Sequence, residues 1–140
     1  MSEGKIKVEI VTPEKHAFEG TVDAVNIPGS RGEFGVLPQH RPMLNALATG
    51  VVTLQEGEAK SYLVIGPGFA DVLPDHVTIL TDRCEAGGDL STDDARKQFD
   101  EIEKNYLAFS GDTRDVEFKE LELDYLWARS ARDASELADK

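Results

Sequence analysis

Hydrophobic and polar residues alternate along the first part of the chain. Near the start, Ile6, Val8 and Ile10 are separated by single charged residues, which is the two-residue period of a strand with one face in water. Similar short segments lie between turn residues at 17–18, 22–27, 33–37, 50–55, 59–65, 69–73 and 76–81. Because no helix of crossover length separates them, the pattern predicts an antiparallel β-sandwich or flattened barrel over residues 1–88.

The remaining residues, 89–140, follow a helical period. Ser91, with Asp94 three residues later, is typical of a helix N-cap. The apolar stripe of the first predicted helix steps by four, three and four residues through Ala95, Phe99, Ile102 and Tyr106. A second helix is predicted from about Val116 towards Leu137, with one face formed by Leu121, Tyr125, Ala128, Ala131 and Ala134. Ser110-Gly111-Asp112 lies between the two, so we expect an antiparallel helical hairpin.

The distribution of glycine and proline supports a boundary near residue 88. All 6 prolines and 11 of the 12 glycines lie in residues 1–88, and only Gly111 lies beyond them. Both residue types are common in turns and rare inside helices. The fold class predicted is therefore α+β, with a β-sandwich domain at 1–88 and a helical hairpin domain at 89–140.

The chain is acidic, with 27 Asp and Glu against 15 Lys and Arg and a formal net charge of -12. Such a charge repels phosphate backbones and anionic lipids, so we expect neither nucleic-acid binding nor direct membrane binding. The first residues lack the apolar core of a signal peptide, so we expect the mature protein to begin at Met1. With Cys84 as the one cysteine, an internal disulfide is excluded and a reducing compartment is favoured.

Groups suited to catalysis or metal binding are scattered. The histidines, His16, His40 and His76, are far apart in the sequence. Cys84 has no second cysteine or evident base nearby, and Asp93-Asp94 is explained by helix capping. No glycine-rich nucleotide loop or nucleophile motif occurs. We therefore expect no active site and no metal site.

The segment 27–42 is unusual, with three prolines and three glycines in sixteen residues. Such a composition stiffens a chain and permits positive φ angles. It fits two tight turns around a short strand. It fits equally a rigid projecting foot that presents Glu33, Phe34, His40 and Arg41 to a partner.

The string Pro-Gly-Ser-Arg-Gly-Glu-Phe-Gly-Val-Leu-Pro-Gln-His-Arg-Pro-Met-Leu, at 28–44, resembles the signature of the epsilon subunit of bacterial F-type ATP synthases, whose mitochondrial counterpart is called delta. Supporting matches lie at 8–14, 50–52, 68–72 and 77–82. Because order, spacing and the two-part architecture agree, the resemblance covers essentially the whole chain.

The resemblance implies a non-catalytic subunit of the central stalk, part of the rotor of a proton-translocating complex that makes ATP from ADP and phosphate. It implies that the sandwich binds the gamma subunit and that the loop 32–42 rests on the membrane c-ring. The residues carried over to this contact are Gly32, Glu33, Phe34, Gly35, Pro38, His40 and Pro42, with Glu33 as the main polar group. The expected location is the cytoplasmic face of the bacterial inner membrane, with membrane contact only through the complex.

For the hairpin, the resemblance implies a possible regulator of ATP hydrolysis that contacts alpha and beta. The second helix here is acidic, which disfavours docking on an acidic segment of beta, and Arg129 and Arg132 are the candidate contacts. A regulatory ATP motif of the family is matched at Asp93 and Arg96 but lacks both apolar positions. We therefore expect no cofactor, with Asp93 and Arg96 as the candidate residues should ATP bind.

Two other functions compete with this interpretation. A free-standing β-sandwich module for carbohydrate or peptide would need an exposed aromatic platform, but the one tryptophan, Trp127, lies in the helical part. A small hydrolase would need a clustered nucleophile and base.

Overall fold

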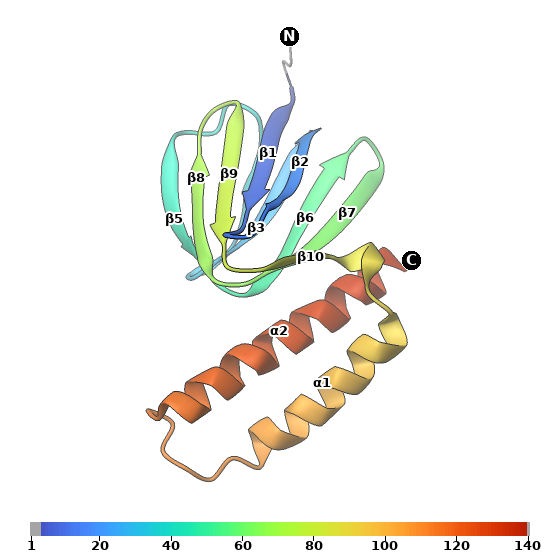
Figure 1. Ribbon diagram of the computed structural model, residues 1–140. Coiled ribbons are helices and arrows are strands. Elements are labelled where there is room, and N and C mark those ends of the chain that lie inside the picture. The colour runs from blue at the N-terminus through green and yellow to red at the C-terminus, as the bar shows by residue number, and fades with distance from the viewer. Residues whose placement is uncertain (1–3, 140) are drawn as a thin grey trace.

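The computed structural model describes residues 4–139, which form a β-sandwich followed by two helices (Figure 1). The strands are β1 (Ile6–Val11), β2 (His16–Val22), β3 (Ala24–Gly29), β4 (Gly32–Val36), β5 (Met43–Leu47), β6 (Gly50–Glu56), β7 (Ala59–Ile65), β8 (Gly68–Val72), β9 (His76–Thr81) and β10 (Cys84–Ala86). They are followed by the 3-10 helix η1 (Gly87–Asp89) and by α1 (Thr92–Leu107) and α2 (Val116–Ala138). The sandwich followed by two helices confirms the predicted fold class.

The strands form two layers that meet at a single bridge between Gly29 and Leu47. One layer has the order β5-β8-β9-β1-β2, and the other has the order β4-β3-β6-β7-β10. All ladders are antiparallel except the one between β1 and β9. This parallel pair departs from the all-antiparallel expectation. It forms because β1 and β9 are distant in sequence, so the intervening strands supply the crossover that a parallel pair needs.

The core lies between the layers and consists mainly of β-branched side chains. Ile6, Val8 and Ile10 of β1 are fully buried, as their alternation predicts. They pack in one cluster with residues of the other strands, including Ile27 and Ile79. The predicted single segment 22–27 is in fact the end of β2 and most of β3, separated by a bend at Asp23.

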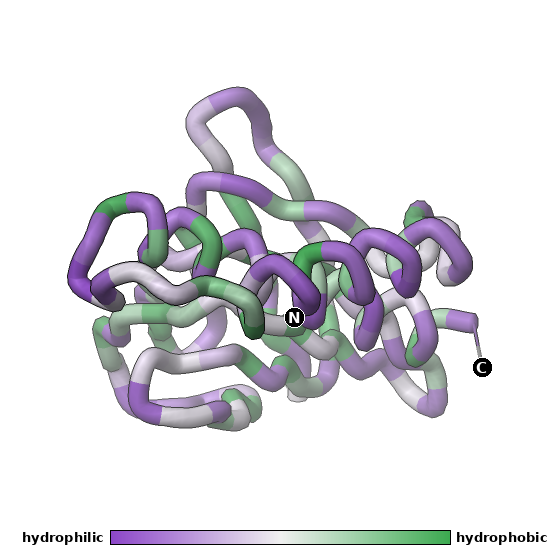
Figure 2. The backbone as a smooth tube through the Cα atoms, turned by 90° about the horizontal axis from the view of Figure 1, so that it is seen from below, coloured by the Kyte–Doolittle hydropathy of each residue, from purple (hydrophilic) through white to green (hydrophobic). Residues whose placement is uncertain are grey.

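The helices begin and end close to their predicted positions. The Ser91 hydroxyl accepts a hydrogen bond from the Asp94 N–H at 3.3 Å, which confirms the predicted N-cap. Aromatic rings fill the space between the helices, and Tyr106 and Tyr125 stack with centroids 4.3 Å apart. Figure 2 shows the helical backbone with mostly hydrophilic residues on its outer side. Within residues 4–139, no helix is long and apolar enough to cross a membrane.

The helix α2 lies between the sandwich and α1 (Figure 1). Its alanines Ala131 and Ala134 pack on the fully buried Val64 of β7. The close approach requires Gly87 of η1, because a Cβ atom there would lie 2.7 Å from the Ala134 carbonyl oxygen. The hairpin is therefore folded against the outer surface of the second layer.

Candidate partner-binding surfaces

The β3–β4 hairpin carries the first residues of the predicted c-ring contact. Its two-residue turn, Ser30-Arg31, is followed by Gly32 with φ of 127°, a value that glycine adopts without strain. Glu33 is exposed, and its carboxylate accepts a hydrogen bond from Asn26 Nδ2 on the neighbouring strand. A carboxylate is thus held on the outer face of the sheet, available to a polar partner.

Three of the predicted contact residues, Pro38, His40 and Pro42, lie far from Glu33. The hairpin turn lies at the carboxyl end of β5, where the Ser30 N–H donates to the Ala46 carbonyl at 3.0 Å. The segment before β5 lies at its other end, where the Gln39 N–H donates to the Pro74 carbonyl at 2.7 Å. The expectation of a single projecting loop at 32–42 is therefore wrong. Most of its first half is the strand β4, whose alternation directs Phe34 and Val36 into the core.

Each predicted residue can be placed individually. The exposed members are Gly32, Glu33, Gly35 and Pro42, and the half-buried members are Phe34, Pro38 and His40. The His40 ring is held by its own loop, since Nδ1 lies at a hydrogen-bond distance of 2.7 Å from the Arg41 carbonyl oxygen. Among the seven residues, Glu33 is the one that presents an exposed acidic side chain to a partner.

A second surface was not anticipated from the sequence. Leu44, Phe69 and Leu80 are 70%, 55% and 51% exposed on the neighbouring strands β5, β8 and β9. Phe69 is directly opposite Leu80 in the β8–β9 register and opposite Ala46 in the β5–β8 register. Leu44 is opposite Asp71, one step along the same face and diagonal to Phe69. We call Leu44, Phe69 and Leu80 together the outer apolar surface. The sequence contains a hint of this surface. Phe69 and Asp71 are two residues apart on β8 and therefore lie on the same face of the sheet, and a charged residue such as Asp71 indicates that this face is exposed.

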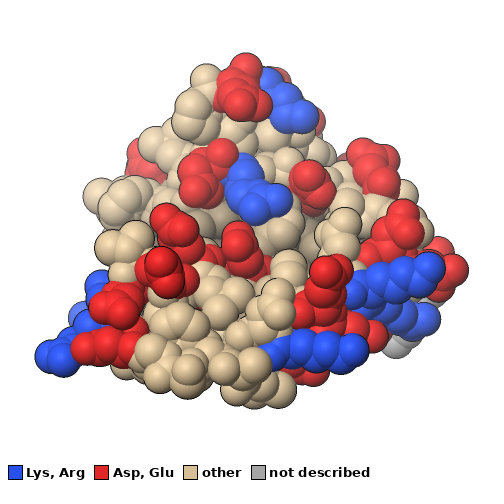
Figure 3. Space-filling model, turned by 60° about the horizontal axis from the view of Figure 1, so that its bottom comes forward, with Lys and Arg blue, Asp and Glu red and all other residues tan. Residues whose placement is uncertain are grey.

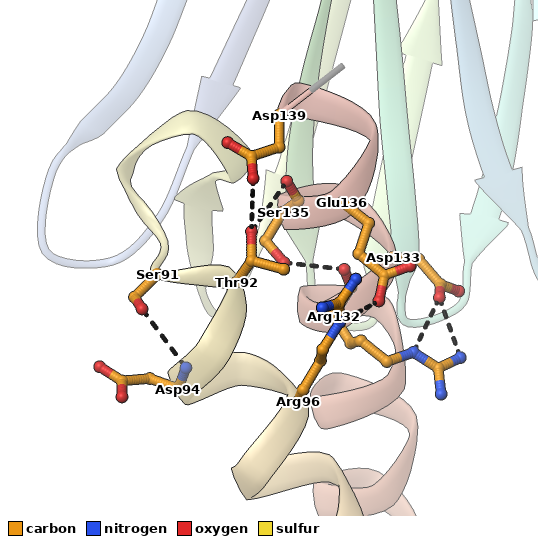
Figure 4. A network of polar contacts seen from close by, with 9 residues as sticks. All are labelled: Ser91, Thr92, Asp94, Arg96, Arg132, Asp133, Ser135, Glu136 and Asp139. Carbon is orange, nitrogen blue, oxygen red and sulfur yellow. Dashed lines mark hydrogen bonds and ion pairs between the residues drawn. The ribbon is translucent and has the colours of Figure 1, made fainter.

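The nucleotide candidates Asp93 and Arg96 lie near the start of α1. Figure 4 shows Arg96 directed across to α2, where its Nε donates to Glu136 at 2.8 Å. The same end of the hairpin is fastened by the Thr92 hydroxyl, which donates to the Asp139 carboxylate at 3.3 Å. The role of Arg96 in this structure is therefore to hold the two helices together.

The head-contact candidates Arg129 and Arg132 both have partners within the hairpin. Arg132 forms an ion pair with Asp133 at 3.0 Å and lies over the Phe99 ring at 4.1 Å from its centroid. Arg129 is exposed and lies 5.7 Å from the Tyr125 ring centroid. Figure 3 shows acidic side chains over much of the underside of the molecule, with fewer lysines and arginines among them. Arg129 is thus the more available of the two.

The fold brings two of the three histidines to one carboxylate, and it leaves the cysteine unreactive. Burial raises the pKa of the Cys84 thiol to about 11, so the thiol is neutral near pH 7 and a poor nucleophile. His16 and His76 each lie within 3.2 Å of the Glu9 carboxylate on the exposed face of β1. Across residues 4–139, no three His, Cys, Asp or Glu side chains converge on a common metal position.

Comparisons with known proteins, by sequence and by fold, both find chains of ATP synthases. Residues 5–87 match the family model of the β-sandwich domain of the ATP synthase delta/epsilon chain. The ATP synthase epsilon chain of Leptospira interrogans is 36% identical over 104 residues, which cover 74% of this chain and 82% of that one. The epsilon chain of Syntrophobacter fumaroxidans is 48% identical over 86 residues, covering 61% of this chain and 64% of that one.

The fold is also similar to that of a chain in the cryo-EM structure of the Euglena gracilis mitochondrial ATP synthase, which contains OSCP, F1 and the c-ring in rotational state 1. The TM-score is 0.77 at 21% sequence identity, and the match covers 94% of this chain and 81% of that chain. The likeness extends through the hairpin as well as the sandwich, since the sandwich alone is shorter than the matched length.

Proposed function

The chain belongs to the ATP synthase delta/epsilon chain family, and on that premise we propose that it joins the gamma subunit to the c-ring in the rotor of an F-type ATP synthase. The family is a non-catalytic one, so chemistry takes place on other subunits. The match of residues 5–87 to the family model carries the proposal. A sandwich with a tightly packed β-branched core suits a part that must transmit force without deforming.

We assign gamma binding to the outer apolar surface. Large apolar side chains gathered on one exposed sheet face, with Phe69 directly opposite Leu80 and Leu44 diagonal to Phe69, are typical of protein–protein contacts. The patch lies on strands β5, β8 and β9, away from the side of the sandwich that the hairpin covers, which involves β6, β7 and η1. A partner can therefore occupy it while the hairpin stays folded.

We assign the polar contact with the c-ring to Glu33, supported by its exposure and by its place on a short hairpin. Pro38, His40 and Pro42 lie at the other end of β5, so we treat them as a contact separate from that of Glu33. Glu33→Ala should leave the isolated chain within about ±0.5 kcal/mol of its normal stability. In the assembled enzyme it should weaken the coupling of proton flow to ATP turnover. A large loss of stability with normal coupling would refute this assignment.

For the location, the proposal places the chain on the cytoplasmic face of a bacterial inner membrane, held there by the complex.

For the hairpin, the proposal assigns no inhibition of ATP hydrolysis. The acidic composition of α2, and the engagement of Arg96 and Arg132 within the hairpin, support this assignment. Regulatory ATP binding is likewise not assigned, because Arg96 already pairs with Glu136.

The rotor proposal is tested by isolating the chain from membranes of its own organism. We expect gamma, alpha and beta to co-purify with it. Phe69→Ser should weaken binding to purified gamma at least about tenfold, as expected for a large buried anchor. Leu107→Ser is the matched control, because Leu107 is 75% exposed on the hairpin and should leave binding unchanged. Equal effects of both variants would contradict the assignment of the surface.

A further inference from the structure

The outer edge of β4 lacks a neighbouring strand. Within residues 4–139, β3 is the only strand that pairs with β4. The two strands are joined by a two-residue turn, so the pair that closes the turn, Gly29–Gly32, is hydrogen-bonded through the backbone. Along an antiparallel ladder, every second pair is hydrogen-bonded in this way. Gly32, Phe34 and Val36 therefore direct their backbone groups to β3.

The residues between them direct their backbone groups away from β3. Glu33 is opposite Pro28, which has no N–H, and whose carbonyl accepts from the Ala48 N–H at 3.0 Å on the far side of β3. Gly35 lies two residues further along β4, so its backbone groups have the same direction as those of Glu33. Both N–H groups and both carbonyls of Glu33 and Gly35 are thus directed outward, in a geometry that can pair with another strand.

Little protects this edge. Exposed edges are usually blocked by lysines, prolines, bulges or very short strands. The one charged side chain of β4, that of Glu33, is hydrogen-bonded to Asn26 over the face of the sheet and does not screen the edge. Gly35 is exposed and has no side chain at all. By contrast, β10 is only three residues long, and β2 carries His16 and Glu19 along with an irregular register against β1.

A hollow lies beside Gly35 on the outer face of the sheet. Its volume is about 350 Å³, and it is lined by Ala24, Val25, Asn26, Gly35, Val36, Leu37, Thr53, Gln55 and Lys60. Leu37, at its rim, is 64% exposed. A strand beside β4 would place one side chain opposite Gly35, and a large side chain there can lie over the glycine and reach the hollow.

We propose that β4 pairs with an extended strand of a partner protein, and that this strand carries a large apolar side chain opposite Gly35. Main-chain hydrogen bonds to Glu33 and Gly35 provide the attachment, and the hollow selects the side chain. The Glu33 carboxylate and the net charge of -12 favour a strand that is neutral or basic. The inference rests on the β4 edge itself and not on the rotor assignment.

Amide hydrogen exchange tests this pairing residue by residue. In the isolated chain, the Phe34 and Val36 amides should exchange slowly, and the Glu33 and Gly35 amides should exchange rapidly. In the complex isolated from membranes, the Glu33 and Gly35 amides should become protected while the other two change little. Co-purification of gamma without added protection at Glu33 and Gly35 would exclude edge pairing within the complex and leave the rotor function standing.

A second experiment does not depend on the complex. A synthetic eight-residue strand peptide with a central phenylalanine and terminal lysines should protect the Glu33 and Gly35 amides of the full chain. Gly35→Pro removes one outward N–H while keeping the ladder to β3, and should weaken the peptide about three- to tenfold, the effect of one neutral backbone hydrogen bond. Gly35→Ala is the matched control, since it keeps the N–H and its Cβ meets only Asn26 Oδ1 at 3.4 Å.

Thermal unfolding shows whether the proline variant is folded. Should it fail to fold, Gly35→Lys provides the same test, because a lysine at an edge opposes strand addition without removing a ladder bond. The proposal is overturned when the Glu33 and Gly35 amides stay unprotected both in the complex and with the peptide, or when the proline and lysine variants bind the peptide as well as the unaltered chain does. Protection that appears in the complex but not with the peptide would still support pairing, with a partner strand of more demanding sequence.

Discussion

The sandwich and the hairpin are held together by different kinds of packing. The sandwich core consists mainly of isoleucines and valines, and most of these, such as Ile10 and Ile79, have no exposed surface. The cluster between α2 and the sandwich has only Val64, Ala131 and Ala134 as buried members, and its larger side chains, Val51, Tyr62, Leu90 and Trp127, are only partly buried. Trp127 lies under the Arg83 guanidinium, which is 3.5 Å from the ring centroid. A large side chain contributes far more free energy on burial than an alanine. The sandwich is therefore a cohesive unit, and the hairpin is attached to it more weakly.

The family model treats the sandwich as a unit of its own, since it describes the β-sandwich domain alone and matches residues 5–87. A rotor part that bears load needs a fixed core, whereas a weakly attached hairpin can differ in sequence without harm to that core. We infer that the rotor contacts reside in the sandwich, and that the hairpin can be altered or separated with the sandwich intact.

The largest effect is expected from a cavity in the sandwich core. Ile79→Ala removes buried methyl groups between the layers and should lower the free energy of unfolding by about 2–5 kcal/mol. The matched hairpin variant is Leu123→Ala, at a position 48% exposed, and should cost less than about 1 kcal/mol. Urea titration followed by circular dichroism measures both. Equal losses would show that the two regions do not differ in cohesion.

A smaller and local effect is expected at the joint between the regions. Gly87→Ala places a Cβ atom 2.7 Å from the Ala134 carbonyl oxygen, so α2 must move, at a cost of about 1–3 kcal/mol. The one tryptophan, Trp127, reports this movement, because its fluorescence should shift as it leaves Arg83. Gly88→Ala is the control, since no atom lies within 4 Å of a Cβ at that position. A shift in both variants, or in neither, would contradict this account of the joint.

A still smaller effect should depend on pH and again separate the two regions. The Gly57 N–H, at 2.6 Å, and the Lys5 ammonium, at 2.8 Å, lower the pKa of Asp23. The stability from this lowered pKa is present above the ordinary value of about 4 and is lost as the pH falls through the depressed value. Asp23→Asn should therefore reduce the loss of stability on acidification.

The matched residue in the hairpin is Asp112, whose pKa is lowered by the Arg114 side chain and backbone N–H. The Asp23 carboxylate accepts a hydrogen bond from Gly57, which is 34 residues away in the sequence. The Asp112 carboxylate accepts one from Arg114, which is only 2 residues away in the turn between the helices. Asp112→Asn should therefore change acid unfolding of the sandwich little. Thermal unfolding at pH 3 and pH 7 distinguishes the two, and a larger effect from Asp112 would refute the argument.

Much of the fold follows from local patterns. The alternation of Ile6, Val8 and Ile10 predicts a buried strand face, and the Ser91 cap with its apolar stripe predicts α1, because both depend on neighbouring residues. The parallel pairing of β1 with β9 could not be predicted in this way, since it joins distant segments. The strand β5 was missed because it follows a proline-rich segment and has no charged residue to mark an alternation.

The candidate contacts were harder to predict, for a physical reason. The composition of residues 27–42 indicates stiffness but not direction, so the separation of Glu33 from His40 by the length of β5 was not visible. The outer apolar surface forms only when Leu44, Phe69 and Leu80, which are distant in sequence, become neighbours. The edge of β4 likewise depends on which strands are absent beside it. Properties of this kind belong to the assembled sheet.

The most direct test compares the full chain with a fragment of residues 1–88 in binding to purified gamma. The fragment should first show cooperative thermal unfolding and a β-type circular dichroism spectrum, since its core is complete without the helices. Calorimetry should then give dissociation constants for the fragment and the full chain within about threefold of each other, a difference below 1 kcal/mol. A folded fragment that fails to bind gamma, or binds it far more weakly, would contradict the claim that the sandwich alone carries the rotor contact.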